Sequence, residues 1–362
     1  MNRILFIIPL WLLYTGLLSA SQGQLELIHA DRSLGKIVDG KKVRILTGDV
    51  VARQDTLNMN CEQAVFYEDE NRIDFIGKVR IDDGHHVLQA RKIRYYTDIR
   101  KADCSGNVRI SGRTDSLYAE RFVYRFRDRI AEGQNNVFVW DKLNRTRLWG
   151  DYGIHNASRK YTLIRKNARF EHQETDQSDT MIINSGKMEY FGQEPRMAIA
   201  IRDVRIHQGE LRADCDSAVY RMSEDLVHLR INPIAWQGES EMKGALIDLK
   251  MDSLQVKDIF IRDEAHLKSL GDSARNKYNY LRGKSIEVEL ENRKPVRITA
   301  RNNASSIYIL NEQGRSQGTN SASSDSIIIY FAGGEMDSIA IIGGTEGIMY
   351  PADYQGEIKG EY

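Results

Sequence analysis

The fold is decided by the stretch Leu88–Gln89–Ala90–Arg91–Lys92–Ile93–Arg94–Tyr95, followed by Gly106–Asn107–Val108–Arg109–Ile110. The same pattern begins 29 residues earlier at Met59 and 29 residues later at Leu117. Self-similarity at a fixed period of this length is the signature of a repeat architecture. Less regular copies begin at Leu148, Ile183, Ala213, Met242, Leu281 and Ser323, with a partial copy near Leu27, so we expect about nine repeats of ~29 residues.

Two positions of the unit have a constant character. The position two residues after the start is small in nearly every copy, and the position seven residues after the start is mostly large. The small position holds Cys61, Ala90, Ala119, Gly150, Ser185, Cys215, Gly244 and Gly283, and the large position holds Phe66, Tyr95, Tyr124, His155, Tyr190, Tyr220, Leu249 and Val288.

Within each copy the apolar residues alternate with polar ones, as in Val79-x-Ile81 and Val108-x-Ile110. This period of two predicts short half-buried strands. We therefore expect an all-β protein with more than half of residues 25–350 in strands and no helix longer than about ten residues. One unit cannot bury its apolar face alone, so stacked units predict a single elongated body.

The N-terminus predicts export. Arg3 precedes the mostly apolar run 4–19, and small residues follow at Ser19, Ala20 and Ser21, as in a secretory signal peptide. The alternative is a retained anchor, although the run is short for a spanning helix. The expected organisation is a signal peptide at 1–20, regular repeats at 21–175, and a continuation with degenerate repeats and insertions at 176–362.

The search for chemistry finds no catalytic motif, no cofactor motif and no metal site. The 51 basic and 51 acidic side chains balance, which argues against a nucleic-acid partner. We expect His85 and His86 to lie in a solvated turn, and Asp214 and Asp216 to be solvent-facing repeat residues. Three cysteines are an odd number, so at least one thiol stays free. A disulfide between Cys61 and Cys215 is disfavoured because copies far apart in a stack do not meet.

The repeated unit resembles that of the OstA-like family. This family comprises the periplasmic bridge protein of lipopolysaccharide transport and the N-terminal domain of its outer-membrane partner. The resemblance is strongest at Leu88–Ile110 and Leu117–Val139 and extends in degraded form over about residues 25 to 350. The chain is longer than the short bridge proteins and lacks the strands of an outer-membrane barrel, which indicates a long form of the Bacteroidota type.

The resemblance implies a V-shaped β-jellyroll, or β-taco, whose trough holds the acyl chains of lipopolysaccharide in the periplasm, without a cofactor. It also implies edge-to-edge contacts with other jellyroll components of the transport machinery at the inner and outer membranes, and possible head-to-tail self-association. We expect the open N-terminal edge of the sheet near Leu25–Val51 and its open C-terminal edge near Ile327–Tyr350. The apolar phase of the repeat assigns the groove lining to Leu88, Ile93, Tyr95, Val108, Ile110, Leu117, Phe122, Tyr124, Val137 and Val139, with Arg94, Arg109 and Arg125 on the opposite face.

Two other classes stay open at this point. One is a structural or adhesive surface repeat with a filled core and no lipid. The other is a polysaccharide-active enzyme on a parallel β-helix, which would need a carboxylate or basic cluster in one place. Asp214 and Asp216 form a close carboxylate pair, as in a glycosidase, but Glu120 and Asp151 fill the Asp216 position in other copies, which favours a repeat residue.

Overall fold

The computed structural model describes residues 23–38, 40–272, 277–312 and 315–358. In these residues the chain forms 24 β-strands and two 3-10 helices of three residues each, η1 (Glu68–Glu70) and η2 (Met222–Glu224). The strands are β1 (Glu26–His29), β2 (Arg32–Val38), β3 (Lys41–Gln54), β4 (Leu57–Tyr67), β5 (Arg72–Asp82), β6 (His86–Tyr96), β7 (Lys101–Gly112), β8 (Asp115–Arg125), β9 (Ile130–Asp141), β10 (Thr146–Asn156), β11 (Tyr161–His172), β12 (Met181–Phe191), β13 (Met197–Gln208), β14 (Leu211–Arg221), β15 (Leu226–Arg230), β16 (Ile234–Gln237), β17 (Ser240–Lys243), β18 (Leu246–Asp252), β19 (Gln255–Asp272), β20 (Lys277–Glu291), β21 (Lys294–Glu312), β22 (Arg315–Ala332), β23 (Glu335–Ile342) and β24 (Glu346–Pro351).

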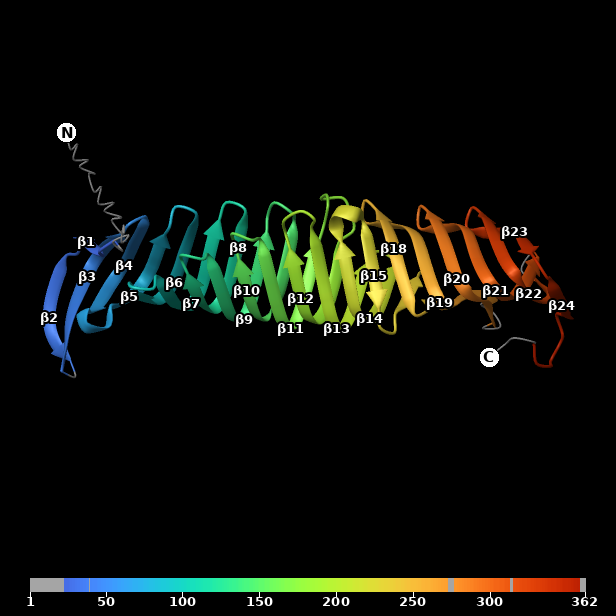
Figure 1. Ribbon diagram of the computed structural model, residues 1–362, viewed down its shortest axis with the longest axis horizontal. Coiled ribbons are helices and arrows are strands. Elements are labelled where there is room, and N and C mark those ends of the chain that lie inside the picture. Colours follow the sequence, from blue (N-terminus) through green and yellow to red (C-terminus); the bar gives the residue numbers. More distant parts are fainter. Residues whose placement is uncertain (1–22, 39, 273–276, 313–314, 359–362) are drawn as a thin grey trace, which may run out of the picture.

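All 24 strands belong to one hydrogen-bonded sheet. From β3 to β14, and again from β18 to β23, each strand pairs antiparallel with the next one in the sequence. The strands lie across the long axis of an elongated body, with the described N- and C-terminal strands at opposite ends (Figure 1). The expected all-β, repetitive and elongated fold is therefore confirmed, and no long helix occurs in the described residues.

Every second long strand bends sharply in its middle. At each bend two consecutive residues adopt positive φ, as in Gly77 (78°) with Lys78 (42°) and Gly106 (83°) with Asn107 (53°). The register of the ladder shifts at the same place. We call this line of bends the crease. In the described residues it runs through Gly48–Asp49, Gly77–Lys78, Gly106–Asn107, Asn135–Asn136, Lys166–Asn167, Arg202–Asp203, Ile231–Asn232, Asp263–Glu264, Asn302–Asn303 and Gly343–Gly344.

The crease explains the small position of the repeat. On the neighbouring strands the small residue lies at the register shift, where a side chain meets backbone at close range. A Cβ on Gly150 would lie 2.3 Å from Ile164 Cγ2 and 3.0 Å from the Lys166 carbonyl oxygen. Cysteine and serine fit here because each donates a hydrogen bond to the carbonyl two residues later. These bonds run from Cys61 to Gln63 (3.1 Å), Ser185 to Lys187 (2.9 Å), Cys215 to Ser217 (3.2 Å) and Ser324 to Ser326 (2.8 Å).

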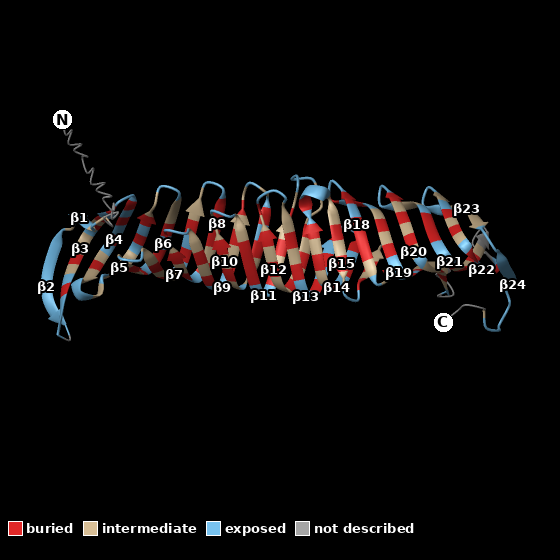
Figure 2. Ribbon diagram, in the orientation of Figure 1, coloured by how far each residue is buried: buried red, intermediate tan, exposed pale blue. Residues whose placement is uncertain are grey.

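The crease divides the sheet into two arms that face each other. Side chains of both arms alternate between the interior and the solvent, and those that face inward form one core along the body (Figure 2). Arm 1 contains one half of each long strand together with four short strands. The halves that precede the crease come from β3, β5, β7, β9, β11, β13, β19 and β21, and the halves that follow it come from β4, β6, β8, β10, β12, β14, β20 and β22. The short strands of arm 1 are β2, β15, β18 and β23. Arm 2 comprises the other halves with β1, β16, β17 and β24.

The late insertions of the repeat lengthen the strands. β4 to β14 have 11 or 12 residues each, whereas β19 to β22 have 18, 15, 19 and 18. The irregular segment β15–β18 separates the two regions. The body is therefore wider at its C-terminal end.

Three further expectations concern the N-terminal segment, membrane-spanning helices and the cysteines. The proposed signal peptide at 1–20 lies outside the described residues. No helix in the described part of the chain is long and apolar enough to cross a membrane. Cys61, Cys104 and Cys215 are all buried and free.

We expect Gly106→Ala to lower the free energy of unfolding by about 1–3 kcal/mol. An added Cβ forces a side chain into left-handed backbone and comes within 2.9 Å of Arg91 Cβ. Urea unfolding followed by circular dichroism measures the change. The control is Asn135→Gly at the equivalent bend, which relieves left-handed strain and should leave stability unchanged or raise it by up to ~1 kcal/mol. Equal losses in both variants would show that the bend does not need glycine.

Candidate functional site: the interior and its mouth

The ten side chains assigned to the groove lining all point into the interior. Each is at most 2% exposed and belongs to the common core. Arg109 is exposed on the outer face, and Arg94 and Arg125 are partly exposed there. The inward and outward phases of the repeat are therefore as the sequence predicted, while the contact of these ten residues with lipid stays a prediction.

The edge opposite the crease, where the tips of the two arms meet, is the mouth of the interior. Here the side chain at the large position of the repeat contacts the other arm. The Tyr95 hydroxyl donates to Gln54 Oε1 at 2.6 Å, and the Tyr190 hydroxyl donates to Asp141 Oδ2 at 3.0 Å. His155, at the same position, has Nε2 3.2 Å from Asp115 Oδ2.

Further contacts between the arm tips extend this row. The Asn144 amide donates to the Gly192 carbonyl at 3.0 Å. Ion pairs join Asp55 to Arg100 and Asp179 to Arg293. We call the row of cross-arm contacts the seam. It comprises Gln54–Tyr95, Asp55–Arg100, Asp115–His155, Asp141–Tyr190, Asn144–Gly192 and Asp179–Arg293.

Asp115 of the seam contacts two histidines. His86 Nε2 also lies 3.0 Å from its Oδ1, and His155 Nδ1 lies 2.9 Å from Thr162 Oγ1. Burial alone raises the pKa of Asp115, but the hydrogen bonds with His155 and His86 outweigh this and hold its pKa well below the ordinary value. The expectation of a solvated turn is thus wrong for His86. Its side chain is only 10% exposed, because it reaches across Gly112 of β7 to contact Asp115 on β8.

The other ionisable groups near the mouth are kept neutral by burial. Burial raises the pKa of the Tyr95 and Tyr190 hydroxyls far above the ordinary value. Burial, reinforced by the charge of Arg196, lowers the pKa of His172 from 6.5 to about 4. The seam is therefore built from neutral donors and a few charged pairs.

Beyond the seam the arms separate. The large position of the repeat becomes Leu249 and Val288, which have no polar group to reach across. Among the long strands β19 to β22 a groove of about 800 Å³ opens between the arms. Its lining is mixed. The apolar side chains include Leu267, Leu270, Leu281, Ile309 and Leu310 of arm 2 and Ile298, Ile329, Phe331 and Met336 of arm 1, and polar ones such as Glu239, Asn279 and Glu335 lie among them. We call it the C-terminal groove.

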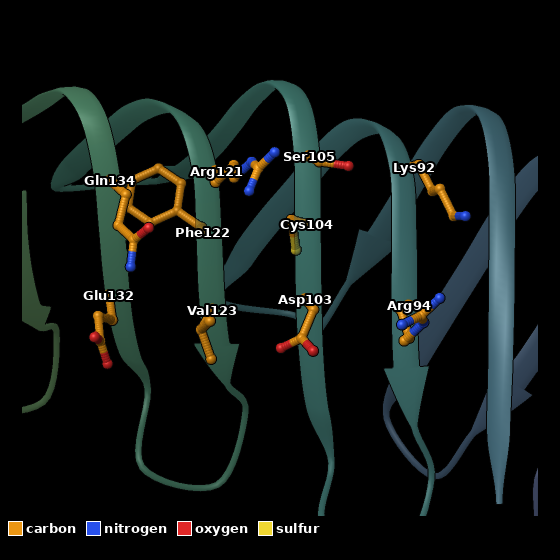
Figure 3. A pocket seen from close by; sticks show the side chains of 10 residues that line it. All are labelled: Lys92, Arg94, Asp103, Cys104, Ser105, Arg121, Phe122, Val123, Glu132 and Gln134. Atoms are coloured by element: carbon orange, nitrogen blue, oxygen red, sulfur yellow. The ribbon is translucent and has the colours of Figure 1, made fainter. Parts of the chain in front are cut away.

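A second hollow lies on the outer face of arm 1. It has a volume of about 400 Å³, and the charged side chains Arg94, Asp103 and Glu132 point from neighbouring strands toward it (Figure 3). The Arg94 guanidinium lies 3.1 Å from the nearly buried Asp74 carboxylate. Lys92 and Arg121 also line the hollow, so cations and anions alternate from strand to strand across it.

No group of three or more His, Cys, Asp or Glu side chains in the described ranges is placed to hold a metal ion. Asp214 and Asp216 are both exposed, and Asp216 Oδ1 accepts a hydrogen bond from the Asp203 amide at 3.4 Å. They lie on the outer face near the crease, where no enclosed site surrounds them.

Residues 22–176 match the model of the family described as OstA-like protein. This part of the chain is therefore similar to the OstA-like family, the resemblance that its repeats predicted.

Among solved structures, the chain is similar to LptH, described as the LptA-homologous periplasmic component of the conserved lipopolysaccharide transport device from Pseudomonas aeruginosa. The two share 14% identity over 39% of this chain and 95% of LptH, with a TM-score of 0.31. No curated protein matches the chain by sequence.

We expect the stability of the protein to fall by about 2 kcal/mol between about pH 7 and pH 5 because of His172. Its ordinary pKa is 6.5 and its folded-state pKa is about 4. Between these values the unfolded chain binds a proton that the folded chain does not, so stability is lost as the pH falls through this window.

Urea unfolding at several pH values measures this loss, and His172→Asn should remove most of it. The control is His207→Asn, whose side chain is exposed on the neighbouring region of arm 2. An unchanged pH dependence in His172→Asn would contradict the assignment.

Proposed function

We propose that the protein is a periplasmic bridge of lipopolysaccharide transport that shields acyl chains between its two arms. The observation that carries this proposal is a single apolar interior that runs along an elongated body and opens into the C-terminal groove. The OstA-like family of residues 22–176 supports the same class of protein.

The physical task matches this interior. An acyl chain in water costs about 0.8 kcal/mol for each exposed CH₂ group. The C-terminal groove, at about 800 Å³, falls within the range of sites that enclose small ligands (~300–1,000 Å³). We therefore assign the first contact with lipid to this groove. The ten lining residues between Leu88 and Val139 would contact the acyl chains once the arms part.

We expect Phe331→Asp to weaken binding of the fluorescent fatty acid cis-parinaric acid by about tenfold or more. Phe331 is half-buried and lines the groove, so a carboxylate there places a charge beside the apolar chain. Fluorescence titration measures the affinity. The matched control is Tyr330→Asp, which changes the neighbouring residue, 39% exposed, and should bind as the wild type does.

The same purified protein should carry lipopolysaccharide when it is extracted from an expressing Gram-negative host. A structural or adhesive repeat would carry none and would not bind the fatty acid. Failure of both measurements would therefore exclude the bridge and favour a purely structural body.

Both ends of the sheet are open. β2 is exposed along its whole length and pairs on one side with β3, and β1 pairs with the other half of the same strand. At the other end β23 and β24 each pair on one side with β22. The expected C-terminal edge began within β22, at residues such as Ile328. However, β22 is paired on both sides, so the C-terminal edge consists of β23 and β24 alone.

These edges carry large apolar side chains, and in the described residues no further strand of the ladder lies beyond them. Such an edge can accept a strand from another protein. The exposed residues include Leu34 (60%) and Ile37 (69%) on β2 and Ile342 (54%) and Met349 (51%) at the C-terminal end. We propose that these edges join further jellyroll components, or other copies of the chain, head to tail.

We expect the double variant Leu34→Lys with Ile37→Lys to weaken self-association by about tenfold or more, because lysine on an edge strand opposes strand addition. Sedimentation velocity over a range of concentrations measures the change. Wild-type oligomers should lengthen with concentration, since a head-to-tail contact does not close. The control is Leu143→Lys, a 65%-exposed residue in a turn in the middle of the body. Equal association of both variants would place the contact elsewhere.

A further inference from the structure

On the outer face of arm 2, one cross-strand row of side chains places three aromatic rings between two arginines. Tyr118 of β8 pairs across the ladder with Phe138 of β9, which pairs with Trp149 of β10. Arg109 of β7 lies opposite Tyr118 at one end, and Arg169 of β11 lies opposite Trp149 at the other. We call these five side chains the aromatic row. Because it crosses the strands, it runs along the long axis of the body (Figure 1).

The rings of the aromatic row face outward and contact one another. The residue that precedes each ring on its strand belongs to the core, so the ring itself lies on the opposite face. The ring centroids of Tyr118 and Phe138 are 5.7 Å apart, and those of Phe138 and Trp149 are 5.0 Å apart. All three side chains are partly exposed. Trp140, two residues after Phe138 on β9, extends this aromatic surface toward the mouth.

The arginine at one end of the row lacks an acidic partner. Arg169 forms an ion pair with Glu171, two residues further along its strand, at 2.6 Å. At Arg109 the equivalent position holds Ser111, whose hydroxyl accepts a hydrogen bond from Arg109 Nε at 2.9 Å. The Arg109 guanidinium lies 5.2 Å from the ring centroid of Tyr118. In the part of the chain that the structure describes, no carboxylate forms an ion pair with Arg109.

Two further cations without an acidic partner lie beside Trp140. The Arg147 guanidinium is 5.7 Å and the Lys142 ammonium 5.8 Å from its ring centroid. Arg147 lies opposite Glu171 across the ladder, but Glu171 accepts hydrogen bonds from Arg169 at 2.8 and 2.6 Å. Within the described ranges neither Arg147 nor Lys142 forms an ion pair with a carboxylate. These cations can therefore bind the anionic groups of a ligand.

The geometry of the row suits a linear ligand built from sugars. Neighbouring strands lie about 4.7–4.9 Å apart, which is close to the length of one sugar unit in an extended glycan. The row thus offers one ring or one guanidinium to each successive sugar. The C–H-bearing face of a sugar packs on an aromatic ring, and a guanidinium binds a carboxylate with two parallel hydrogen bonds.

We propose that the aromatic row, together with Trp140, Arg147 and Lys142, binds a linear glycan that carries carboxylates at intervals. The glycan lies along the body axis and is a polymer separate from the lipid of the proposed function. Single-stranded nucleic acid also stacks on aromatic rings, but it has a phosphate at every unit and needs a continuous line of cations. Exposed Glu120 and Asp151 follow Tyr118 and Trp149 by two residues, so a sparsely charged chain fits this face better.

A hyaluronan hexasaccharide, in which every second sugar carries a carboxylate, is a suitable probe. We expect it to bind the full chain with a Kd below about 1 mM in isothermal titration calorimetry. The methyl ester of the same hexasaccharide keeps the sugars but has no charge. It should bind at least about tenfold more weakly, because the bonds between guanidinium and carboxylate are lost.

The rings are tested by Phe138→Leu combined with Trp149→Leu, which should weaken binding of the hexasaccharide by about tenfold or more. The matched control is Tyr161→Leu combined with Phe191→Leu. It removes an outward-facing pair of rings on arm 1, with centroids 5.1 Å apart, and should bind as the wild type does.

The cations give a second test that leaves the rings in place. Arg109→Gln combined with Arg147→Gln should weaken binding of the hexasaccharide by about tenfold and leave binding of its methyl ester unchanged. Circular dichroism of each variant establishes that the sheet is intact. If the ring variant unfolds, the arginine variant decides the outcome.

Three results would overturn the proposal. One is no detectable binding of the hexasaccharide at millimolar concentration, and another is an equal loss in the row variants and the arm 1 control. The third is tighter binding of a single-stranded oligothymidylate or of hexaglutamate through the same rings, which would assign the row to nucleic acid or to an acidic peptide.

The proposed lipid function can fail separately. Phe331→Asp, in the C-terminal groove, should bind the hexasaccharide as the wild type does, and the two row variants should bind cis-parinaric acid normally. If the fatty acid fails to bind but the hexasaccharide results are as expected, the glycan row stands without the lipid function.

Discussion

The crease is the constraint on which the rest of the structure depends. Two consecutive residues in left-handed backbone turn every second long strand through a sharp bend, and the ladder continues on both sides of the bend. Left-handed backbone costs a non-glycine residue roughly 1–2 kcal/mol, which explains the glycines at 48, 77 and 106. Asparagine replaces them at 135–136 and 302–303, where it is the best tolerated alternative. Because the bends are in register, one sheet folds over itself along its whole length.

Folding the sheet over itself buries the apolar face that a single repeat cannot bury alone. A half-strand such as 92–96 has one apolar face, which a flat sheet would leave in water. The bend brings this face against the other arm, and the two faces form a continuous core. Since the bend repeats, so does the core, and the interior is one continuous apolar cluster along the body.

The two long edges of the interior are held by different kinds of interaction. The crease is made of covalent chain and backbone ladders, whereas the mouth is held by side chains such as Tyr95, His155 and Tyr190. Where the repeat places Leu249 and Val288 instead, the arms separate into the C-terminal groove. A carrier of acyl chains needs this combination, because the lining must stay dry and the load must still enter and leave.

The sequence by itself determined the repeat, the strands, the inward phase of residues such as Ile93 and Val108, and the OstA-like resemblance. All of these follow from periodicities within one unit, which neighbouring residues fix through local backbone geometry and burial. The large position of the repeat was also evident from the sequence. The contacts of its side chains were not, because their partners lie on other repeats. His155 meets Asp115, 40 residues away, and Asp179 meets Arg293, 114 residues away. Only the tertiary structure decided that His86 is buried under the mouth, that the mouth is closed along the regular repeats, and that it opens where β19 to β22 lengthen. These features depend on how far apart the two arm tips lie, and that distance is set by the stacking of many strands.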